Sequence, residues 1–449
     1  MSGQIARQAE AASAADDRVP LTRLHLLAVF VCALGLAVDV AELALGGVLS
    51  AVFSAPPHAV SRTELSWLLA AAYAGAVIGA PAFGWLADRH GRRALLFAAL
   101  VTLALASAAA AASANVGQLA LLRLLGGVAL GAYPPLMFAY LSELLPPVQR
   151  GRLLMVSVAI AGLGPVALVF AVHGLTPLAP LGIEGWRWGF LLGSLGAGLC
   201  SLLFLLLPES PYWLARREAR ACAADAGSRC RPDHVAHLPA GSAPSGPEGA
   251  PQGGTAASPS RSRGGLAFVV ACFFLTPWAV LGFQVLGGAV LVHHGFSLGD
   301  SLLLVGVFTF GPVAGALLGS VVIDRVERRT LVVASAGTLA IVALAFGFAR
   351  SLPALTASGV AFGVLASALL PAFAVYAAEL FPTDQRAGAI SCGWAANRVG
   401  SALVPIVLLP ILDGSGPAVM FAVIAATLVA LAVLVAMRGP LGRSGRALG

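Results

Sequence analysis

The stretch GWLADRHGRR, at residues 84–93, separates two long apolar runs and places four charged side chains within six residues. A reduced copy, DRVERR, occupies residues 324–329. Charged positions recur at one offset of 236 residues, in the pairs Asp88 and Asp324, Glu143 and Glu379, and Arg150 and Arg386. Only 10 % of the chain is charged, so chance explains these matches poorly. The chain is therefore predicted to consist of two halves of the same design.

Around these markers the composition is that of a membrane protein. Hydrophobic residues make up 59 % of the 449 residues, whereas charged residues fall well short of the roughly 25 % found in soluble domains. This composition excludes an ordinary soluble enzyme, a disordered chain and a disulfide scaffold. A spanning helix needs about 20 apolar residues, and the apolar runs predict an all-α membrane protein with twelve transmembrane helices. The predicted spans are 26–50, 66–87, 94–113, 118–141, 153–173, 187–207, 266–291, 301–322, 330–349, 354–378, 388–411 and 418–437.

The arginines predict the orientation of these spans, because all 27 basic residues are arginine. Of these, 22 fall on the side of the two termini, three on the other side and two within spans. By the positive-inside rule the rich side is cytoplasmic, so we expect both termini there and the chain in the cell inner membrane. The net charge of +7 could indicate a nucleic-acid partner, but the placement of the arginines fits membrane topology better. Since no basic stripe with interleaved aromatic residues occurs, we expect no nucleic-acid partner.

The spans and breaks divide the chain into five predicted parts. A cytoplasmic tail (1–23) precedes a six-helix bundle (24–215), a flexible cytoplasmic linker (216–264), a second six-helix bundle (265–437) and a cytoplasmic tail (438–449). The linker is rich in Pro, Gly, Ser and Ala, so it cannot bury enough apolar surface to offset the entropy of ordering. Its cysteines and histidines match no common zinc spacing, and we expect no metal.

Several charged motifs at the predicted cytoplasmic ends resemble those of one family. The loop at 84–93 resembles the signature loop of the major facilitator superfamily, and 324–329 resembles a second copy in which Glu327 replaces a glycine. ELLPPVQRGR at 143–152 and ELFPTDQR at 379–386 resemble the acidic-proline-arginine motifs after spans four and ten. PESPYWL at 208–214 resembles the segment after span six in sugar-porter-like and organic-ion members. The resemblance implies a secondary transporter, not an enzyme, built from two six-helix bundles around a central site.

These motifs combine carboxylates with arginines at helix ends, and bidentate pairs of this kind can lock one conformation and break in another. We expect them to close the cytoplasmic side as a gate. The alternative is simple anchoring of helix ends at the membrane interface. The gating residues expected from the motifs are Asp88, Arg89, Arg92, Glu143, Arg152, Glu209, Asp324, Arg328, Glu379 and Arg386.

Four charged side chains fall inside predicted spans, where an ionisable residue is costly and usually faces a partner or a cavity. Asp39 and Glu42 are three residues apart on one face of span one. At 1.5 Å per residue, Asp39 and Arg123 of span four both lie about 7–10 Å below the outer edge of the membrane, so a contact between them is feasible. Arg398 of span eleven comes out near the midplane, where an anionic substrate would be held.

The pattern Asp39-Val-Ala-Glu42 resembles the paired acidic motif in span one of the aromatic-acid:proton symporters, although Glu42 stands where Asp is usual and Ala41 where a bulky aromatic is common. Those transporters also carry arginines in spans four and eleven, matched here by Arg123 and Arg398. The resemblance implies import of a small organic anion, an aromatic or related monocarboxylate, together with protons. Asp39, Glu42 and Arg123 are then the proton-coupling residues, because burial and a nearby arginine act oppositely on a carboxylate's affinity for a proton. The candidate substrate contacts are Arg398, Gln284, Tyr376, Trp394 and Asn397. Other aromatic side chains of the spans, among them Tyr73, Phe283 and Phe308, could also line a pocket for an aromatic ligand, although a span aromatic more often packs against helices or lipid.

Other interpretations remain open at this point. A static Asp39–Arg123 bridge would merely align helices, and the glycines and proline of 162–165 partly match the motif of drug or metabolite:proton antiporters. A sugar symporter usually has a Gln/Asn-rich seventh span, in which Gln284 stands alone here. A non-transporting membrane sensor is the alternative from a different class. We expect no cofactor beyond the proton gradient as driving force, and a monomer in the lipid bilayer.

Overall fold

The computed structural model describes residues 21–215, 217, 259–322, 327–381 and 383–439. Most of the predicted linker and tails lies outside these residues, as does Asp324. The described part is all-helical, without a strand. The helices of the first half are α2 (Arg23–Val52), α3 (Arg62–His90), α4 (Arg92–Ala111), α5 (Val116–Leu144), α6 (Pro147–Ala161), α7 (Leu163–Leu178) and α8 (Gly185–Phe204). Those of the second half are α10 (Pro259–His293), α11 (Leu298–Phe308), α12 (Phe310–Val322), α13 (Arg328–Phe348), α14 (Leu352–Glu379) and α15 (Thr383–Arg438).

The helices account for the predicted spans, with two differences. Two predicted spans are joined in the single helix α15, and two others are each divided into two helices. Ten helical segments of the described chain are long and apolar enough to cross a membrane, and Leu352–Ser367 of α14 is a shorter apolar one. One of the ten, Ala389–Arg438, is interrupted at Gly416, where a positive φ of 81° separates two arms. If the two arms are counted separately and α14 is added, the described helices are consistent with twelve spans. The fifth and eighth spans are each divided into two helices, which meet at Gly162 (α6 and α7) and at Thr309 (α11 and α12). Both residues keep right-handed helical angles (φ −60°, ψ −20° and φ −68°, ψ −14°), so each span continues through its junction.

Several helices begin a few residues before the apolar runs because polar side chains cap them. At the start of α3 the Ser61 hydroxyl accepts a hydrogen bond from the Glu64 N–H (3.3 Å), and the Glu64 carboxylate accepts one from the Ser61 N–H (3.1 Å). This reciprocal capping box satisfies N–H groups that the helix leaves free. The charged motif at 84–93 also contains a helix boundary, because Gly91, at φ 104°, ends α3 and precedes α4. Only glycine adopts this backbone conformation without strain.

Close helix packing repeats between the halves at the same offset as the charges. In the first half, Gly75 and Gly79 of α3 face Gly127 of α5, and a Cβ atom on any of them would meet backbone of the other helix. Adding 236 gives Gly311 and Gly315 of α12 and Gly363 of α14, and Gly311 and Gly315 again face α14 backbone. Small residues let helices approach closely where lipid supplies no hydrophobic drive. The internal repeat therefore fixes packing geometry as well as charge.

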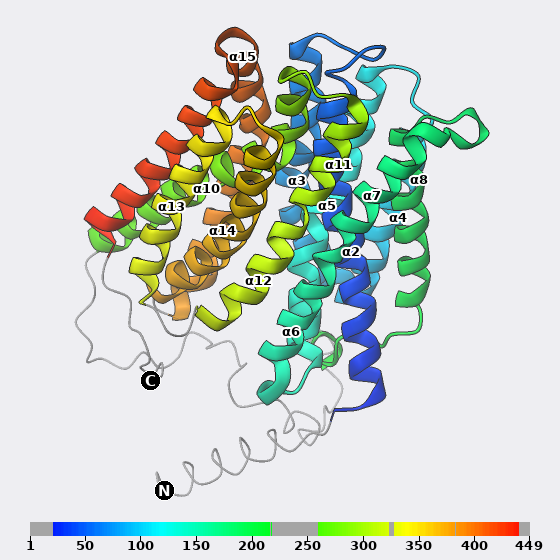
Figure 1. Cartoon of the computed structure of the whole chain (residues 1–449). Helices are drawn as coiled ribbons and strands as arrows, with labels where there is room; N and C mark the ends of the chain where they lie inside the picture. Colours follow the sequence, from blue (N-terminus) through cyan, green and yellow to red (C-terminus); the bar gives the residue numbers. More distant parts are fainter. Residues whose placement is uncertain (1–20, 216, 218–258, 323–326, 382, 440–449) are drawn as a thin grey trace, which may run out of the picture.

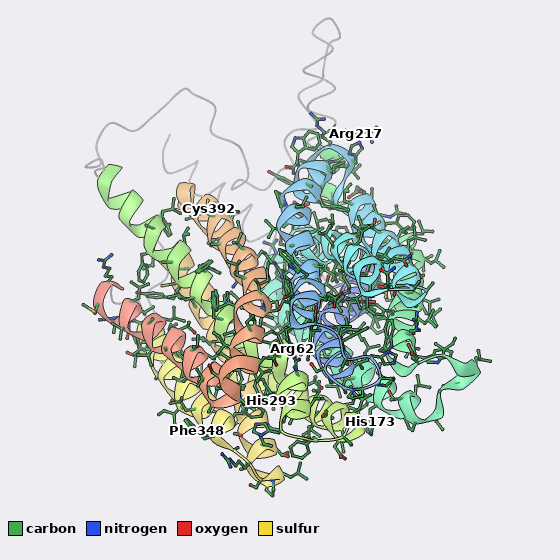
Figure 2. All side chains as sticks on the ribbon, turned by 90° about the horizontal axis from the view of Figure 1, so that it is seen from above. Arg62, His173, Arg217, His293, Phe348 and Cys392 are labelled. Carbon is green, nitrogen blue, oxygen red and sulfur yellow. The ribbon has the colours of Figure 1, made fainter. Side chains whose placement is uncertain are left out.

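The two halves lie side by side and meet along a seam (Figures 1 and 2). Across this seam α3 packs against α15, α2 against α10, and α7 against α11. We call the end of the bundle that carries residues 84–93 and 208–214 the motif end, and the opposite end the far end. Near the far end the Ala289 N–H of α10 donates to the Ser50 hydroxyl of α2 (3.2 Å), and Gly288 packs on the Gly47 carbonyl. Direct backbone packing thus joins the halves there.

Replacement of Gly79 by alanine is expected to destabilise the protein, because the added Cβ would meet the Val128 carbonyl and backbone has little room to move. The cost of such overpacking is about 1–3 kcal/mol. Gly174→Ala is the matched control, because this glycine also lies in a helix and nothing surrounds its Cβ position within 4 Å. Thermal unfolding of the purified protein in detergent measures both. Equal melting temperatures for the two variants would contradict the packing role.

Candidate functional site

At the motif end, charged and polar side chains of three motifs in the first half form one connected network. Arg92 binds Asp88 through Nη1 (2.8 Å) and approaches Glu143 of α5 through Nε (3.4 Å). The other Glu143 oxygen accepts a hydrogen bond from the Ser210 hydroxyl (2.5 Å). The Trp213 indole donates to the Asp88 carbonyl (3.2 Å). The three motifs quoted from the sequence thus meet at one place, although they are far apart in the chain.

The Glu209 side chain lies at the N-terminus of α4, although the residue itself follows α8 in the chain. Its carboxylate accepts hydrogen bonds from the N–H groups of Arg93 and Ser210, both at 2.9 Å, where the free N–H groups of a helix favour an anion. Arg93 in turn donates to the Phe204 and Leu205 carbonyls at the end of α8 (2.9 and 3.0 Å). Glu209 and Arg93 therefore cap two helix ends against each other and brace this side of the first half.

The remaining predicted gate residues divide into two sets. Arg89 stacks on the Trp85 ring (4.0 Å to the centroid), and Arg152 is exposed. Asp324 and the side chains of Arg328, Glu379 and Arg386 lie outside the described residues. The second-half copy of the network is therefore not described, and its gating role stays a prediction.

At the far end, an ion pair joins the two halves. The Arg62 Nε at the start of α3 lies 2.6 Å from the Asp413 carboxylate of α15. Arg62 also donates through Nη1 to the Ser54 hydroxyl (2.9 Å), which fixes its direction. Figure 2 shows Arg62 near the boundary between the two sets of helices. Because its members belong to different halves, this pair must break if the halves separate at the far end.

Inside the first half, Glu42 and Arg123 form a buried pair. Their side chains are almost wholly inaccessible, with 1 % and 4 % of the residue surface exposed. Arg123 Nη1 donates to the Glu42 carbonyl (3.0 Å) and lies 3.8 Å from its Oε2. The Ser107 hydroxyl of α4 donates to Glu42 Oε1 (2.6 Å). The Arg123 guanidinium also lies over the Phe190 ring of α8 (5.8 Å). Glu42 is therefore held by charge and by hydrogen bonds within one half.

This arrangement differs from the expected Asp39–Arg123 contact. The Cα depths of the two residues agree, but a helical side chain points back toward the N-terminus of its helix. The N-terminus of α5 is at the far end, so the long Arg123 side chain reaches toward that end. There it meets Glu42, which lies one turn farther along α2 than Asp39.

Asp39 is buried, with 1 % of its surface exposed, and neither carboxylate oxygen has a hydrogen-bond partner within the described residues. The positive group that acts most strongly on it is Arg398 of α15, in the other half. Arg398 is half-buried and makes no hydrogen bond in the part of the chain described. The structure thus joins Glu42 and Arg123 in one ion pair within a half. Asp39 and Arg398 belong to different halves and act on each other electrostatically, without forming an ion pair within the described residues.

A cavity of about 160 Å³ lies between the halves, and none of the four intramembrane charges is among the residues that line it. From the first half Tyr73, Gly162 and Pro165 line it. From the second half Phe283, Gln284 and Thr309 do, with further apolar side chains. Gly162 and Thr309, where α6 meets α7 and α11 meets α12, therefore border the same cavity.

The walls of the cavity from the second half are aromatic. Phe283 and Phe362 stack with ring centroids 4.4 Å apart, and Phe308 packs against Phe283 at 5.3 Å. All three rings line the cavity. Aromatic rings recognise one another by stacked and edge-to-face contacts. The cavity can therefore bind a small planar apolar group.

Of the five predicted substrate contacts, Gln284 alone is among the residues that line this cavity. Arg398 does not line it and acts electrostatically on Asp39. Asn397 donates through Nδ2 to the Phe273 carbonyl (3.2 Å). That carbonyl loses its usual helical partner because Pro277, four residues on, has no N–H. Asn397 therefore supplies the hydrogen-bond donor that Pro277 removes from α10.

Tyr376 and Trp394 were also predicted as substrate contacts and do not border the cavity. Tyr376 is fully buried, and its ring lies 6.4 Å from that of Phe373. It is the repeat counterpart of Tyr140 in the first half, 236 residues earlier. The Trp394 ring packs on Phe273 at 5.6 Å. Both contribute to packing within the second half.

Ser107 was absent from the sequence-based set, because it is one of many serines in alanine-rich helices and nothing in the sequence distinguishes it. Tyr73 was expected only as one of several aromatic side chains that could line a pocket, since a polar aromatic in a span is a weak signal of a cavity. The structure places Tyr73 in the wall of the cavity, together with Phe283 and Phe308.

Two similar helical halves, paired buried charges and a cavity at their seam define a multi-pass membrane transporter. Residues 26–237 match the family described as "Sugar (and other) transporter", and residues 266–447 match the "Major Facilitator Superfamily". A gallate transporter of Pseudomonas putida is 30 % identical over 86 % of this chain and 85 % of its own length. The 4-hydroxybenzoate transporter PcaK of Acinetobacter baylyi is 26 % identical over 87 % of this chain and 85 % of its own length.

A solved structure described as the inward open conformation of the xylose transporter XylE from E. coli has a TM-score of 0.73. It is 19 % identical and covers 93 % of this chain and 97 % of that chain, so it is similar in fold. The chain belongs to the major facilitator superfamily, which confirms the resemblance carried by the charged motifs.

Asn397→Ala is expected to lower the melting temperature of the purified protein without changing its affinity for substrate. The variant leaves the buried Phe273 carbonyl without a partner, which costs about 1–3 kcal/mol. Asn397→Asp should act similarly, because a carboxylate cannot donate to the carbonyl. Unchanged stability together with weaker substrate binding would instead return Asn397 to the set of substrate contacts.

Proposed function

We propose that this chain is a proton-coupled transporter that imports a small aromatic monocarboxylate by alternating access. The motif end is then cytoplasmic, as the arginine distribution predicts, and the protein lies in the cell inner membrane. The observation that carries the proposal is the buried Asp39 carboxylate, which has no hydrogen bond within the described residues and faces Arg398 across the seam.

Asp39 is the group to which we assign the transported proton. An ionised carboxylate buried without hydrogen bonds is costly, and binding a proton removes its charge. Glu42 is less suited, because Ser107 and Arg123 already stabilise its charged form. Between the two carboxylates that the sequence left open, the hydrogen-bonding pattern therefore favours Asp39.

The coupling follows from exchange of partners at Arg398. With no substrate bound, the Arg398 guanidinium faces the ionised Asp39. A substrate carboxylate competes for the same guanidinium, and Asp39 then loses its countercharge and takes up a proton. Two carboxylates and two guanidiniums give the cluster no net charge, and one anion entering with one proton leaves it unchanged. We therefore propose one proton for each monocarboxylate.

The cavity favours an aromatic substrate over a sugar or a large drug. Its polar side chains are few, with Tyr73, Gln284 and Thr309 among them, so the many hydroxyl groups of a sugar would be buried without partners at considerable cost. Its volume of about 160 Å³ is below the roughly 300–1,000 Å³ of pockets for drug-sized ligands. The printed names of two relatives, a gallate and a 4-hydroxybenzoate transporter, support the same class.

Alternating access requires contacts that close each end in turn. At the far end the Arg62–Asp413 pair joins the halves. At the motif end we propose that the Asp88–Arg92–Glu143 network contacts the second half, whose matching residues lie outside the described part. The far-end pair then opens as the motif-end contact closes.

Asp39→Asn is expected to abolish substrate accumulation driven by a pH gradient, because the amide cannot carry the proton, while exchange of labelled for unlabelled substrate persists. The measurement is uptake by reconstituted vesicles of a panel of benzoates, nicotinate, shikimate and short acids, beside a sugar and a cationic dye. Asp300→Asn, at an exposed helix start, is the matched control. Uphill uptake by the Asp39 variant would refute the assignment, and movement of the dye alone would favour the antiporter alternative.

Uptake of a monocarboxylate by the wild-type protein is expected to be electroneutral, because one negative and one positive charge enter together. A membrane potential imposed at equal pH should leave the initial rate unchanged, whereas an inwardly directed proton gradient should raise it. Both are measured in the same vesicles with a potassium ionophore. A rate that follows the potential would contradict the one-to-one ratio.

A further inference from the structure

We infer that the Tyr73 hydroxyl binds the carboxylate of the substrate and so fixes which way the substrate lies in the cavity. This inference rests on the proposed function and extends it to a residue and a binding orientation. Tyr73 lies in the middle of α3, lines the cavity and has only 2 % of its surface exposed. Its hydroxyl makes no hydrogen bond within the described residues.

The other buried tyrosines of the first half differ from Tyr73 in this respect. The Tyr133 hydroxyl donates to the Cys32 carbonyl (3.1 Å), and the Tyr140 hydroxyl donates to the Pro208 carbonyl (2.7 Å). Buried tyrosine hydroxyls usually find such a partner, and leaving one unpaired costs free energy. At Tyr73 the cavity is the place from which a partner can come, so a ligand atom that accepts a hydrogen bond fits there.

The charges around Tyr73 favour an anionic acceptor. Arg123 and Arg398 both act electrostatically on this side chain. Arg123 is engaged by Glu42, but Arg398 has no hydrogen bond in the described part of the chain and can serve a ligand. Arg398 does not line the cavity, but its positive charge acts at Tyr73 and favours a carboxylate as the group that accepts a hydrogen bond from the Tyr73 hydroxyl. The Tyr73 side of the cavity therefore receives the acid group.

The second half supplies the rest of the orientation. Phe283, Phe308 and Phe362 offer ring faces and edges to a planar ring. Gln284 of α10 also lines the cavity, and its exposed amide makes no hydrogen bond within the described residues. An amide both donates and accepts, so it can bind hydroxyl groups on the ring. Tyr73 should then read the acid group common to all substrates, and Gln284 the ring substituents that distinguish them.

Binding measurements on purified protein separate these two roles. The probes are benzoate, 4-hydroxybenzoate and 3,4,5-trihydroxybenzoate, with benzamide as the ligand without a carboxylate. Tyr73→Phe should raise the Kd of all three acids by a similar factor of about 10- to 100-fold, the usual effect of losing a hydrogen bond to a charged group. It should raise the Kd of benzamide by a smaller factor, because a neutral amide oxygen accepts a weaker hydrogen bond than a carboxylate does. Gln284→Met should weaken only the ring-hydroxylated acids.

The matched control is Tyr140→Phe, which removes a hydroxyl outside the cavity and should leave all Kd values unchanged. Tyr73→Phe keeps the ring and leaves no protein group without its hydrogen-bond partner, so the variant should fold. If it does not fold, Tyr73→Leu is compared with the wild type on the same ligands. Equal binding of the acids by wild type and variant, or a loss confined to hydroxylated acids, overturns the inference alone. Wild-type protein that binds none of the acids overturns the proposed function together with it.

Discussion

Burial of four ionisable side chains among apolar helices is the constraint on which the rest of this structure depends. Each charge must have a partner, because isolated charges in such an environment are costly. Glu42 finds Arg123 and Ser107 within its own half, whereas Asp39 faces Arg398 in the other half. Any relative movement of the halves therefore preserves the first pair and changes the second. Conformation and protonation are linked at Asp39 for this geometric reason.

This link requires halves that move as rigid units. The glycine contacts between α3 and α5, repeated between α12 and α14, bring helix backbones together so closely that the interior of each half resists deformation. Glu209 and Arg93 add a brace at the motif end by capping α4 and α8 against each other. Movement is then directed to the seam, where Gly162 and Thr309 border the cavity.

The sequence was sufficient to predict the class of fold, because spans, charge asymmetry and the repeat are properties of composition and order. It also singled out four charges in apolar runs as candidates for a site, and the structure buries Asp39, Glu42 and Arg123 among the helices. It could not predict their pairing, because that depends on the direction of the Arg123 side chain and not on Cα depth. Nor could it separate Asn397, which repairs a proline kink in a neighbouring helix, from a substrate contact. Such roles depend on contacts between distant segments.

The repeat itself explains why the halves share a design and yet do different chemistry. Positions 236 residues from Asp39, Glu42, Arg123 and Arg398 hold Leu275, Trp278, Gly359 and Gly162. The packing glycines and the charged ends recur, but the buried charges do not. Access from both sides in turn requires halves that can exchange similar contacts, so selection for motion keeps those features alike. Coupling requires a carboxylate whose countercharge comes from across the seam. If Asp39 had a copy of Arg398 within its own half, movement of the halves would leave its surroundings unchanged, and nothing would tie the proton to the substrate.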